Sequence, residues 1–205
     1  MNKWSIAWIV VFAAVLIWSG IAPFDRITWI LEVLPAVLGF IALALTRNRF
    51  PLTPLLYGLI LFHCVVLMVG GHYTYAEVPF FDWLSEVFGW DRNNYDKLGH
   101  FTQGFVPVLI AREIVLRKDV IRGQAWTHFF VVCFALAFSA FYELIEWWVA
   151  LASGEDAEAF LGTQGYIWDT QSDMLWCLSG AIIAVALLSR LQDRQIARIR
   201  GLETP

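Results

Sequence analysis

Six apolar stretches of about twenty residues each dominate this chain of 205 residues. They run roughly over residues 4–21, 27–46, 52–70, 97–116, 125–149 and 169–189. Because an α-helix rises about 1.5 Å per residue, about twenty residues cross the ~30 Å hydrocarbon core of a bilayer. A chain that is 59% hydrophobic and 16% charged is also unlike a soluble domain. We therefore expect an all-α, polytopic transmembrane bundle of six spans, forming a single integral membrane domain over residues 1–205.

Lysine and arginine residues gather in alternate loops between these stretches. Because basic residues of loops that flank membrane spans remain in the cytoplasm, their distribution predicts the orientation of the chain. With the N-terminus placed inside, the inward-facing residues are Lys3, Arg47, Arg49, Arg117, Lys118, Arg122, Arg190, Arg194, Arg198 and Arg200. The outward-facing ones are Arg26, Arg92 and Lys97, and Glu155, Asp156 and Glu158 mark the last outer loop. We expect both termini to be cytoplasmic, with residues 190–200 continuing the last helix as a cationic extension.

The long outer loop over residues 71–96 contains a short amphipathic segment between Pro79 and Gly89. At 100° per residue its apolar side comprises Phe80, Phe81, Trp83, Leu84, Val87 and Phe88, and its polar side Asp82, Ser85 and Glu86. Proline suits the first turn of a helix and glycine its end. We expect an interfacial helix at the outer membrane surface. Packing of its apolar side against the top of the bundle is the alternative.

Nearly all ionisable residues of the apolar stretches fall at one depth when the spans are threaded through a bilayer. They are Glu32, His63, Asp96, Lys97, His100, Glu143, Glu146, Asp169 and Asp173. A charge in hydrocarbon costs at least about 2.5–3.5 kcal/mol on insertion scales, so nine such residues at one level indicate a functional site. The pattern places this site in the outer part of the membrane.

The fourth span opens with Asp96, Lys97 and His100, followed by Gln103 one turn further along. Asp96 and His100 are four residues apart and share a helix face. A carboxylate in this position can orient the imidazole, or both side chains can bind one metal ion. Alternatively, Asp96 caps the helix and Lys97 extends to the lipid headgroups.

The fifth and sixth spans each carry a pair of carboxylates at helical spacing. Glu143 and Glu146 are three residues apart, and Asp169 and Asp173 four apart. Acidic groups that lie this close in a low dielectric share a proton or require a cation. An exposed interfacial position for Glu146 and a capping role for Asp169 are the structural alternatives.

Six carboxylates, with Lys97 as their only fixed cation, require protons, a metal or a cationic ligand for balance. Oxygen donors with one or two imidazoles suit a divalent metal such as Mg²⁺, Mn²⁺, Zn²⁺ or non-haem iron. The predicted metal ligands are Asp96, His100, Glu143, Glu146, Asp169 and Asp173, and the predicted acid/base residues His100, Glu143 and Glu146. Glu32, His63, His72, Lys97 and Gln103 are supporting residues.

The remaining polar and thiol residues of the spans have structural explanations. Arg112, Glu113 and His128 lie at cytoplasmic ends, where pairing or contact with headgroups explains them. The cysteines Cys64, Cys133 and Cys177 lie in apolar runs without metal-ligand spacing and are expected to be core side chains. The sequence contains no basic, aromatic-rich surface that would indicate nucleic acid as a partner.

Three motifs of the second half resemble known membrane families. They are Asp96-Lys97-x-x-His100-Phe101, Glu143-x-x-Glu146, and Asp169-x-x-x-Asp173 with Gly180 beyond. Over essentially its whole length the chain resembles the YjdF-type inner-membrane proteins of bacteria. The second half is more distantly similar to VanZ-like proteins, which are linked to teicoplanin resistance. The resemblance implies a multi-pass protein of the bacterial inner (cytoplasmic) membrane with a role at the cell envelope.

Three functions are compatible with these patterns. In the first, the carboxylate/histidine site acts on a lipid headgroup or a lipid-linked envelope precursor that arrives from the outer leaflet. In the second, Glu143 and Glu146 carry protons in a proton-coupled transporter, against which the inner half shows no continuing polar residues. In the third, the protein binds or scaffolds an envelope ligand without turnover. Membrane lipids are partners in each case, and the patterns do not set the oligomeric state.

Overall fold

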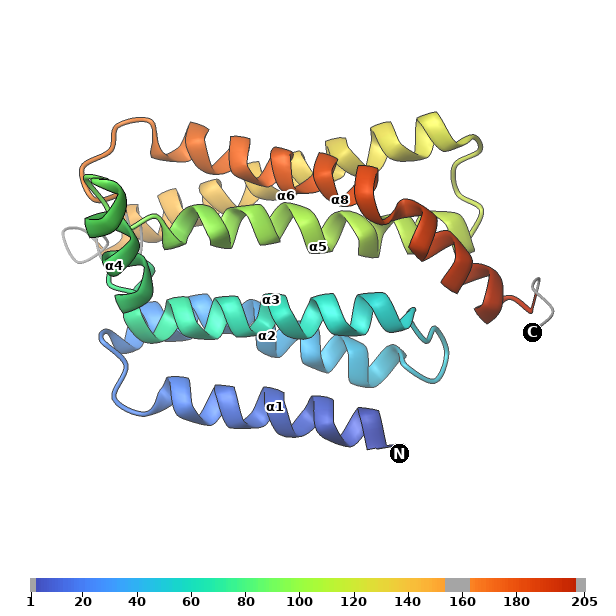
Figure 1. The fold of residues 1–205 in the computed structure, drawn as a ribbon, viewed down its shortest axis with the longest axis horizontal. Coiled ribbons are helices and arrows are strands. Elements are labelled where there is room, and N and C mark those ends of the chain that lie inside the picture. The colour runs from blue at the N-terminus through green and yellow to red at the C-terminus, as the bar shows by residue number, and fades with distance from the viewer. Residues whose placement is uncertain (1–2, 154–162, 202–205) are drawn as a thin grey trace.

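The computed structural model describes residues 3–153 and 163–201, which form seven α-helices and no strand. The helices are α1 (Lys3–Gly20), α2 (Arg26–Thr46), α3 (Pro54–Tyr73), α4 (Pro79–Phe88), α5 (Tyr95–Arg117), α6 (Gln124–Ser153) and α8 (Asp169–Ile199). The six long helices run alternately up and down, and α4 crosses one end of the bundle, opposite the two termini (Figure 1). The all-helical prediction is confirmed, as is the helical extension beyond residue 189. Glu155, Asp156 and Glu158 lie outside the described residues.

Local sequence signals explain where several helices begin and end. The Asp25 carboxylate accepts a hydrogen bond of 2.7 Å from the Thr28 amide and so caps α2, and this bond lowers the pKa of Asp25. Pro54 and Pro79 occupy the first turns of α3 and α4. Gly89 ends α4 at a φ of 66°, a left-handed conformation that favours glycine.

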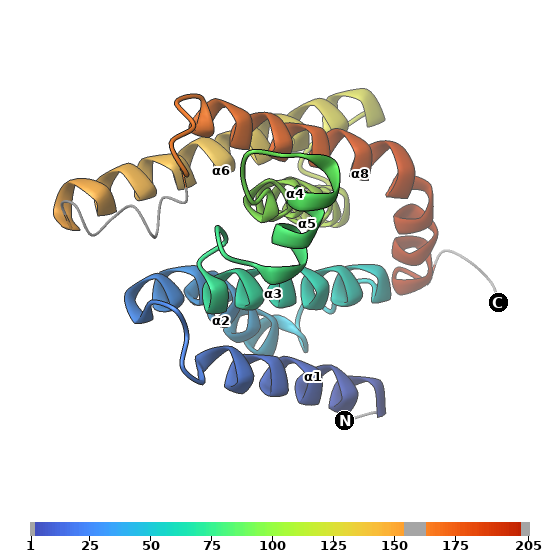
Figure 2. The same ribbon diagram turned by 60° about the vertical axis from the view of Figure 1, so that its left-hand side comes forward.

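Five of the six long helices are long and apolar enough to cross a membrane: α1, α2, α3, α6 and α8. The exception is α5, which has a sufficient length of 23 residues but carries charged residues near both ends. Helix α5 lies in the middle of the bundle, between α3 on one side and α6 and α8 on the other (Figure 2). Its neighbours cover these charges, so α5 can hold polar side chains that a lipid-facing helix could not.

Helices α5 and α8 pack backbone against backbone. A Cβ atom at Gly104 would overlap the carbonyl oxygen of Cys177, and one at Gly180 would overlap the carbonyl oxygen of Phe101. Small residues allow such close approach between membrane helices. This contact fixes the relative register of the two helices, and with it the acidic residues near their starts.

A layer of buried apolar side chains fills the middle of the bundle and draws on all six long helices. Its best-buried members include Phe12, Ala36, Leu56, Met68, Val108, Leu109, Val131, Ala135, Ala181 and Ala184. Many large apolar side chains of α1, α2 and α6 instead point outward, as lipid contact requires. The apolar layer separates two polar regions, one at each end of the bundle.

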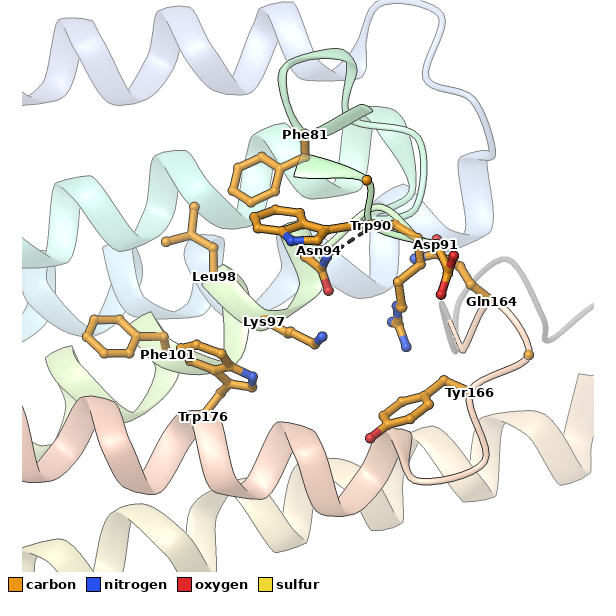
Figure 3. Close-up of a pocket in the computed structure, with 13 residues that line it drawn as sticks. Phe81, Trp90, Asp91, Asn94, Lys97, Leu98, Phe101, Gln164, Tyr166 and Trp176 are labelled. Atoms are coloured by element: carbon orange, nitrogen blue, oxygen red, sulfur yellow. Dashed lines mark hydrogen bonds between the residues drawn. The ribbon is translucent and has the colours of Figure 1, made fainter. Parts of the chain in front are cut away.

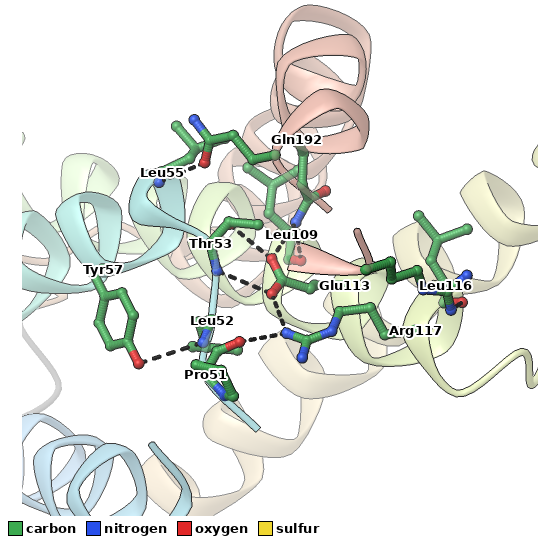
Figure 4. A network of polar contacts seen from close by, with 12 residues as sticks. Pro51, Leu52, Thr53, Leu55, Tyr57, Leu109, Glu113, Leu116, Arg117 and Gln192 are labelled. Atoms are coloured by element: carbon green, nitrogen blue, oxygen red, sulfur yellow. Dashed lines mark hydrogen bonds and ion pairs between the residues drawn. The ribbon is translucent and has the colours of Figure 1, made fainter. Parts of the chain in front are cut away.

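The polar region at the end that holds the termini is a buried hydrogen-bond network, here called the inner network (Thr53, Arg112, Glu113, Arg117 and Gln192). The Glu113 carboxylate accepts bonds from the Thr53 amide at 3.0 Å, the Thr53 hydroxyl at 2.8 Å and Arg117 at 2.9 Å (Figure 4). Arg112 donates to Gln192 at 2.9 Å. Pairing therefore explains Arg112 and Glu113, which is one of the two explanations that their position at the helix ends predicts.

Helix α4 exposes most of its apolar side. Phe80, Trp83, Val87 and Phe88 are all more than half exposed, whereas Phe81 packs against the Tyr95 ring at a centroid distance of 5.1 Å. Only Phe81 and Leu84 of the apolar side are half-buried, so a largely uncovered apolar face favours the expected interfacial helix over packing on the bundle.

Candidate functional site

Three helices bring four carboxylates around one imidazole at the α4 end of the bundle. This acid–histidine cluster comprises Asp96 and His100 of α5, Glu143 and Glu146 of α6, and Asp173 of α8. Two sets of three residues each offer ligand atoms that lie within 4.8 Å of one another: Asp96, His100 and Asp173, and His100, Glu143 and Glu146. His100 belongs to both sets and is therefore the centre of the cluster.

The His100 ring is held from both sides. Its Nε2 lies 3.3 Å from an Asp96 oxygen, as the four-residue spacing predicts, and its Nδ1 lies 3.1 Å from the Gln103 side-chain oxygen. The Glu143 carboxylate is 3.8 Å from the same Nδ1. Asp96 does not cap the helix, because Asn94 holds the capping position. The orientation of a buried imidazole by a carboxylate is a common feature of catalytic and metal-binding histidines.

Three carboxylate oxygens of the cluster have no hydrogen-bond partner within the described part of the chain. They belong to Asp96, Glu143 and Asp173, whose exposed fractions are 8%, 8% and 3%. Buried acceptors are normally paired, because an unpaired buried polar group costs about 1–3 kcal/mol and a charged one more. These oxygens point to a missing donor or cation.

The structure adds Arg92 to the site, a residue that the sequence pattern places only in the outer loop. One guanidinium nitrogen lies 2.5 Å from an Asp169 oxygen and another 3.9 Å from Asp96, in side chains that are about one-tenth exposed. The prediction that Lys97 is the only fixed cation of the site is therefore wrong. Asp169 lies against Arg92, outside the two ligand sets around His100, so it neither caps α8 nor reaches the centre. The four-residue spacing between Arg92 and Asp96 is the sequence pattern that could have indicated Arg92 as a site residue.

Glu32 approaches the cluster from α2. It is 6% exposed, interacts electrostatically with the cluster and faces the hydroxyl groups of Tyr75 and Tyr142. The Tyr75 ring occupies the space that side chains at Gly70 and Gly99 would need. Neither tyrosine was a predicted site residue, because only the tertiary structure brings them to Glu32.

The two other supporting histidines lie apart from the cluster. His63 is half-buried on α3 and belongs to neither ligand set. The His72 Nδ1 is 3.0 Å from the Ser19 carbonyl oxygen, and its ring packs against Trp18 at a centroid distance of 4.6 Å. His72 therefore ties the α3 end to the α1–α2 connection. Lys97 belongs to neither ligand set and lines a neighbouring cleft, where its ammonium lies 6.0 Å from the centre of the Tyr166 ring.

Comparison with known proteins assigns the chain. Residues 4–194 match the family described as "Predicted membrane protein (DUF2238)". The chain belongs to this family. It is also 54% identical over 190 residues to the inner membrane protein YjdF of Escherichia coli (strain K12), which covers 93% of this chain and 90% of that protein. No solved structure matches the chain.

Membership of this DUF2238 family confirms the predicted YjdF-type resemblance. The protein is a multi-pass inner-membrane protein, in agreement with its five long apolar helices. The more distant VanZ-like resemblance and the roles of the site residues stay predictions.

Proposed function

We propose that the acid–histidine cluster binds a divalent cation and acts on a lipid headgroup or a lipid-linked envelope precursor from the outer leaflet. One observation carries this proposal. His100 belongs to both ligand sets, and within each set the ligand atoms lie within 4.8 Å of one another. In addition, three of the surrounding carboxylates each have a buried oxygen without a hydrogen bond.

The donor set fits a hard or borderline cation. It consists of carboxylate oxygens and one imidazole without thiolates, which suits Mg²⁺, Mn²⁺, Zn²⁺ or non-haem iron. Ligand atoms about 2.0–2.2 Å from one ion lie at most about 4.4 Å apart, so small side-chain rotations would complete such a site. The set of Asp96, His100 and Asp173 is fully buried and offers two negative charges to balance the ion. When bound, the cation would polarise a phosphoryl or carbonyl oxygen.

With Asp96, His100 and Asp173 assigned to the cation, Glu143 and Glu146 remain for proton transfer. They lie three residues apart on α6 and next to His100, so one carboxylate can hold a proton while the other is ionised. Such a pair can supply both the acid and the base of a hydrolytic or transfer reaction. The close approach of Glu143 to His100, at 3.8 Å, supports this division of roles.

Proton-coupled transport is the second candidate, and the inner network is the observation that favours it. Both polar regions lie along α5, where Gln103 and Arg112 are nine residues or about 13 Å apart. The residues between them include Val106, Val108 and Leu109, which are at most 1% exposed. These buried apolar side chains separate the two polar regions and offer no group that could carry a proton, so we rank transport below action on a lipid.

The proposal is tested by reconstituting the protein into liposomes of total bacterial inner-membrane lipids, with each of the four cations in turn. Mass spectrometry of the lipids before and after incubation measures any headgroup change. We expect a cation-dependent change with the wild type and with the control Glu86→Gln, an exposed acid of α4, and none with Glu143→Gln. An unchanged lipid profile with every cation would contradict catalysis and support binding without turnover.

A further inference from the structure

A cleft of about 940 Å³ opens beside the acid–histidine cluster, lined by α5, the start of α8 and the segments that precede them (Figure 3). We propose that this cleft binds a phosphate-bearing lipid of the outer leaflet, with Lys97 and Arg92 holding the phosphate and aromatic rings holding the first part of the acyl chain. This inference deepens the proposed function, on which it rests for the outward position of the site, by naming its substrate class.

Two cations meet at one end of the cleft. The Lys97 ammonium and the Arg92 guanidinium lie 6.0 Å and 5.5 Å from the centre of the Tyr166 ring, so both charges lie near the same aromatic ring. The Lys97 side chain points into the opening between Tyr166 and Asn94 (Figure 3). Among the described residues no carboxylate forms an ion pair with Lys97. Lys97 and Arg92 thus bring two positive charges to this end of the cleft, and phosphate is an anion that lysine and arginine both bind.

Arg92 is paired with Asp169 through one guanidinium nitrogen, and its positive charge adds to that of Lys97 at this end of the cleft. The same side chain thus lines the cleft and contacts the acidic residues behind it. A headgroup held at Lys97 and Arg92 would lie next to Asp96, which directly precedes Lys97 in the chain, and so at the edge of the cluster.

The other end of the cleft is apolar. Phe101 lies one helical turn beyond Lys97, and Trp176 lies opposite it on α8 (Figure 3). Phe101 stacks on Phe105 at a centroid distance of 5.6 Å and so extends the apolar surface by a further turn. Since α5 and α8 both run away from the α4 end, these rings lie deeper in the membrane than the cations. The cleft therefore changes from cationic to apolar along the bilayer normal, which complements the anionic phosphate and the apolar chains of a phospholipid.

The depth of this gradient favours a lipid over free phosphate or a soluble phosphate ester. A soluble anion would use only Lys97 and Arg92 and would leave the aromatic half of the cleft empty. Trp90 and Tyr166 border the polar end and are each at least 40% exposed. Tryptophan and tyrosine rings in this position are typical of the headgroup level of a bilayer.

Binding of short-chain lipids to the detergent-purified full chain tests the inference. Isothermal titration compares dioctanoyl phosphatidylglycerol with dioctanoylglycerol, which lacks the phosphate, and with glycerol 1-phosphate, which lacks the chains. We expect the phospholipid to bind at least tenfold more tightly than either. Lys97→Gln should weaken phospholipid binding at least tenfold, Lys97→Arg should retain it, and the exposed outer cation variant Arg26→Gln should match the wild type.

Wild-type affinity in Lys97→Gln would overturn the inference, and so would equal affinity for glycerol 1-phosphate. Trp176→Ala separates the two halves of the cleft, since it should weaken the phospholipid and leave glycerol 1-phosphate unaffected. Cation content of the same samples distinguishes this inference from the proposed function. Lys97→Gln should keep the cation while losing the lipid, whereas His100→Gln should lose the cation and keep the lipid. Lipid binding that depends on Lys97 in a protein without any cation would overturn the proposed function alone.

Discussion

At the scale of single residues, the charge balance at the α4 end depends on Arg92. Its guanidinium faces Asp169 and Asp96 in side chains that are about one-tenth exposed, next to a cluster that already holds four carboxylates. A buried ion pair adds little stability over an apolar pair, but the loss of one partner leaves the other charge uncompensated.

We therefore expect Arg92→Gln to lower the free energy of unfolding by about 3–5 kcal/mol. The double variant Arg92→Gln/Asp169→Asn should recover a large part of this loss, because the second change removes the uncompensated carboxylate. Denaturant unfolding in detergent micelles, followed by circular dichroism, measures both. Losses that simply add in the double variant would show that the two residues do not act as a pair.

At the scale of helices, the position of the cluster depends on the contact between α5 and α8. Gly104 and Gly180 let the two backbones touch, and this contact places Asp173 of α8 beside Asp96 and His100 of α5. Because the obstacle at each glycine is backbone, a side chain there would force the helices apart.

Gly104→Ala and Gly180→Ala should each destabilise the protein by about 1–3 kcal/mol, as overpacking of a filled core does. Gly58→Ala on α3 is the matched control, since its Cβ would meet nothing within 4 Å. That change should be neutral or slightly stabilising, because alanine favours helix. Thermal unfolding of the three variants checks this order, and equal stability of all three would contradict the close α5–α8 contact.

The inner network joins α3, α5 and α8 at the opposite end. Glu113 is fully buried and accepts four hydrogen bonds, from the Thr53 amide and hydroxyl, Arg117 and Gln192. Glu113→Ala removes the acceptor of all four. We expect this change to lower the free energy of unfolding by about 3–5 kcal/mol. The contrasting change is Asp193→Asn. Asp193 pairs with Arg112 at 2.8 Å, but its side chain is 44% exposed. This change should therefore lower the free energy of unfolding by less than about 1 kcal/mol. If unfolding experiments showed similar losses of stability for Glu113→Ala and Asp193→Asn, the assigned difference in burial would be contradicted.

At the scale of the whole molecule, the account depends on which end of the bundle faces outward. Both termini lie at the end opposite α4 (Figure 1), and the excess of Lys and Arg at that end predicts that it is cytoplasmic. One added cysteine at a time in a Cys133→Ser background tests this, since the exposed Cys133 is removed and the remaining Cys64 and Cys177 are buried. A membrane-impermeant maleimide should label Glu86→Cys in intact spheroplasts, and Arg47→Cys only after permeabilisation. The reverse pattern would place the cluster on the cytoplasmic side.

Hydrophobic length and helical spacing were enough to predict the helices and most of the cluster. The spacings of Asp96 with His100 and of Glu143 with Glu146 are local, so each pair could be placed on one helix face from the sequence. The pairing of Arg92 with Asp169 joins residues 77 positions apart, and the bond of Thr53 to Glu113 joins residues 60 apart. Such contacts depend on the register of packed helices, which no local pattern encodes. The cleft around Lys97 was missed for the same reason, because part of its lining comes from α8 and the segment before it.

The cation content of the purified protein tests the central claim most directly. Elemental analysis by plasma mass spectrometry compares the wild type with His100→Ala, Asp173→Asn and the surface control Glu86→Gln, after purification with the four cations supplied. We predict one divalent cation per chain in the wild type and in the control, and its loss from both cluster variants at unchanged helix content. A folded wild type without a stoichiometric cation would contradict the account, and the carboxylates around His100 would then be balanced by protons or an organic ligand.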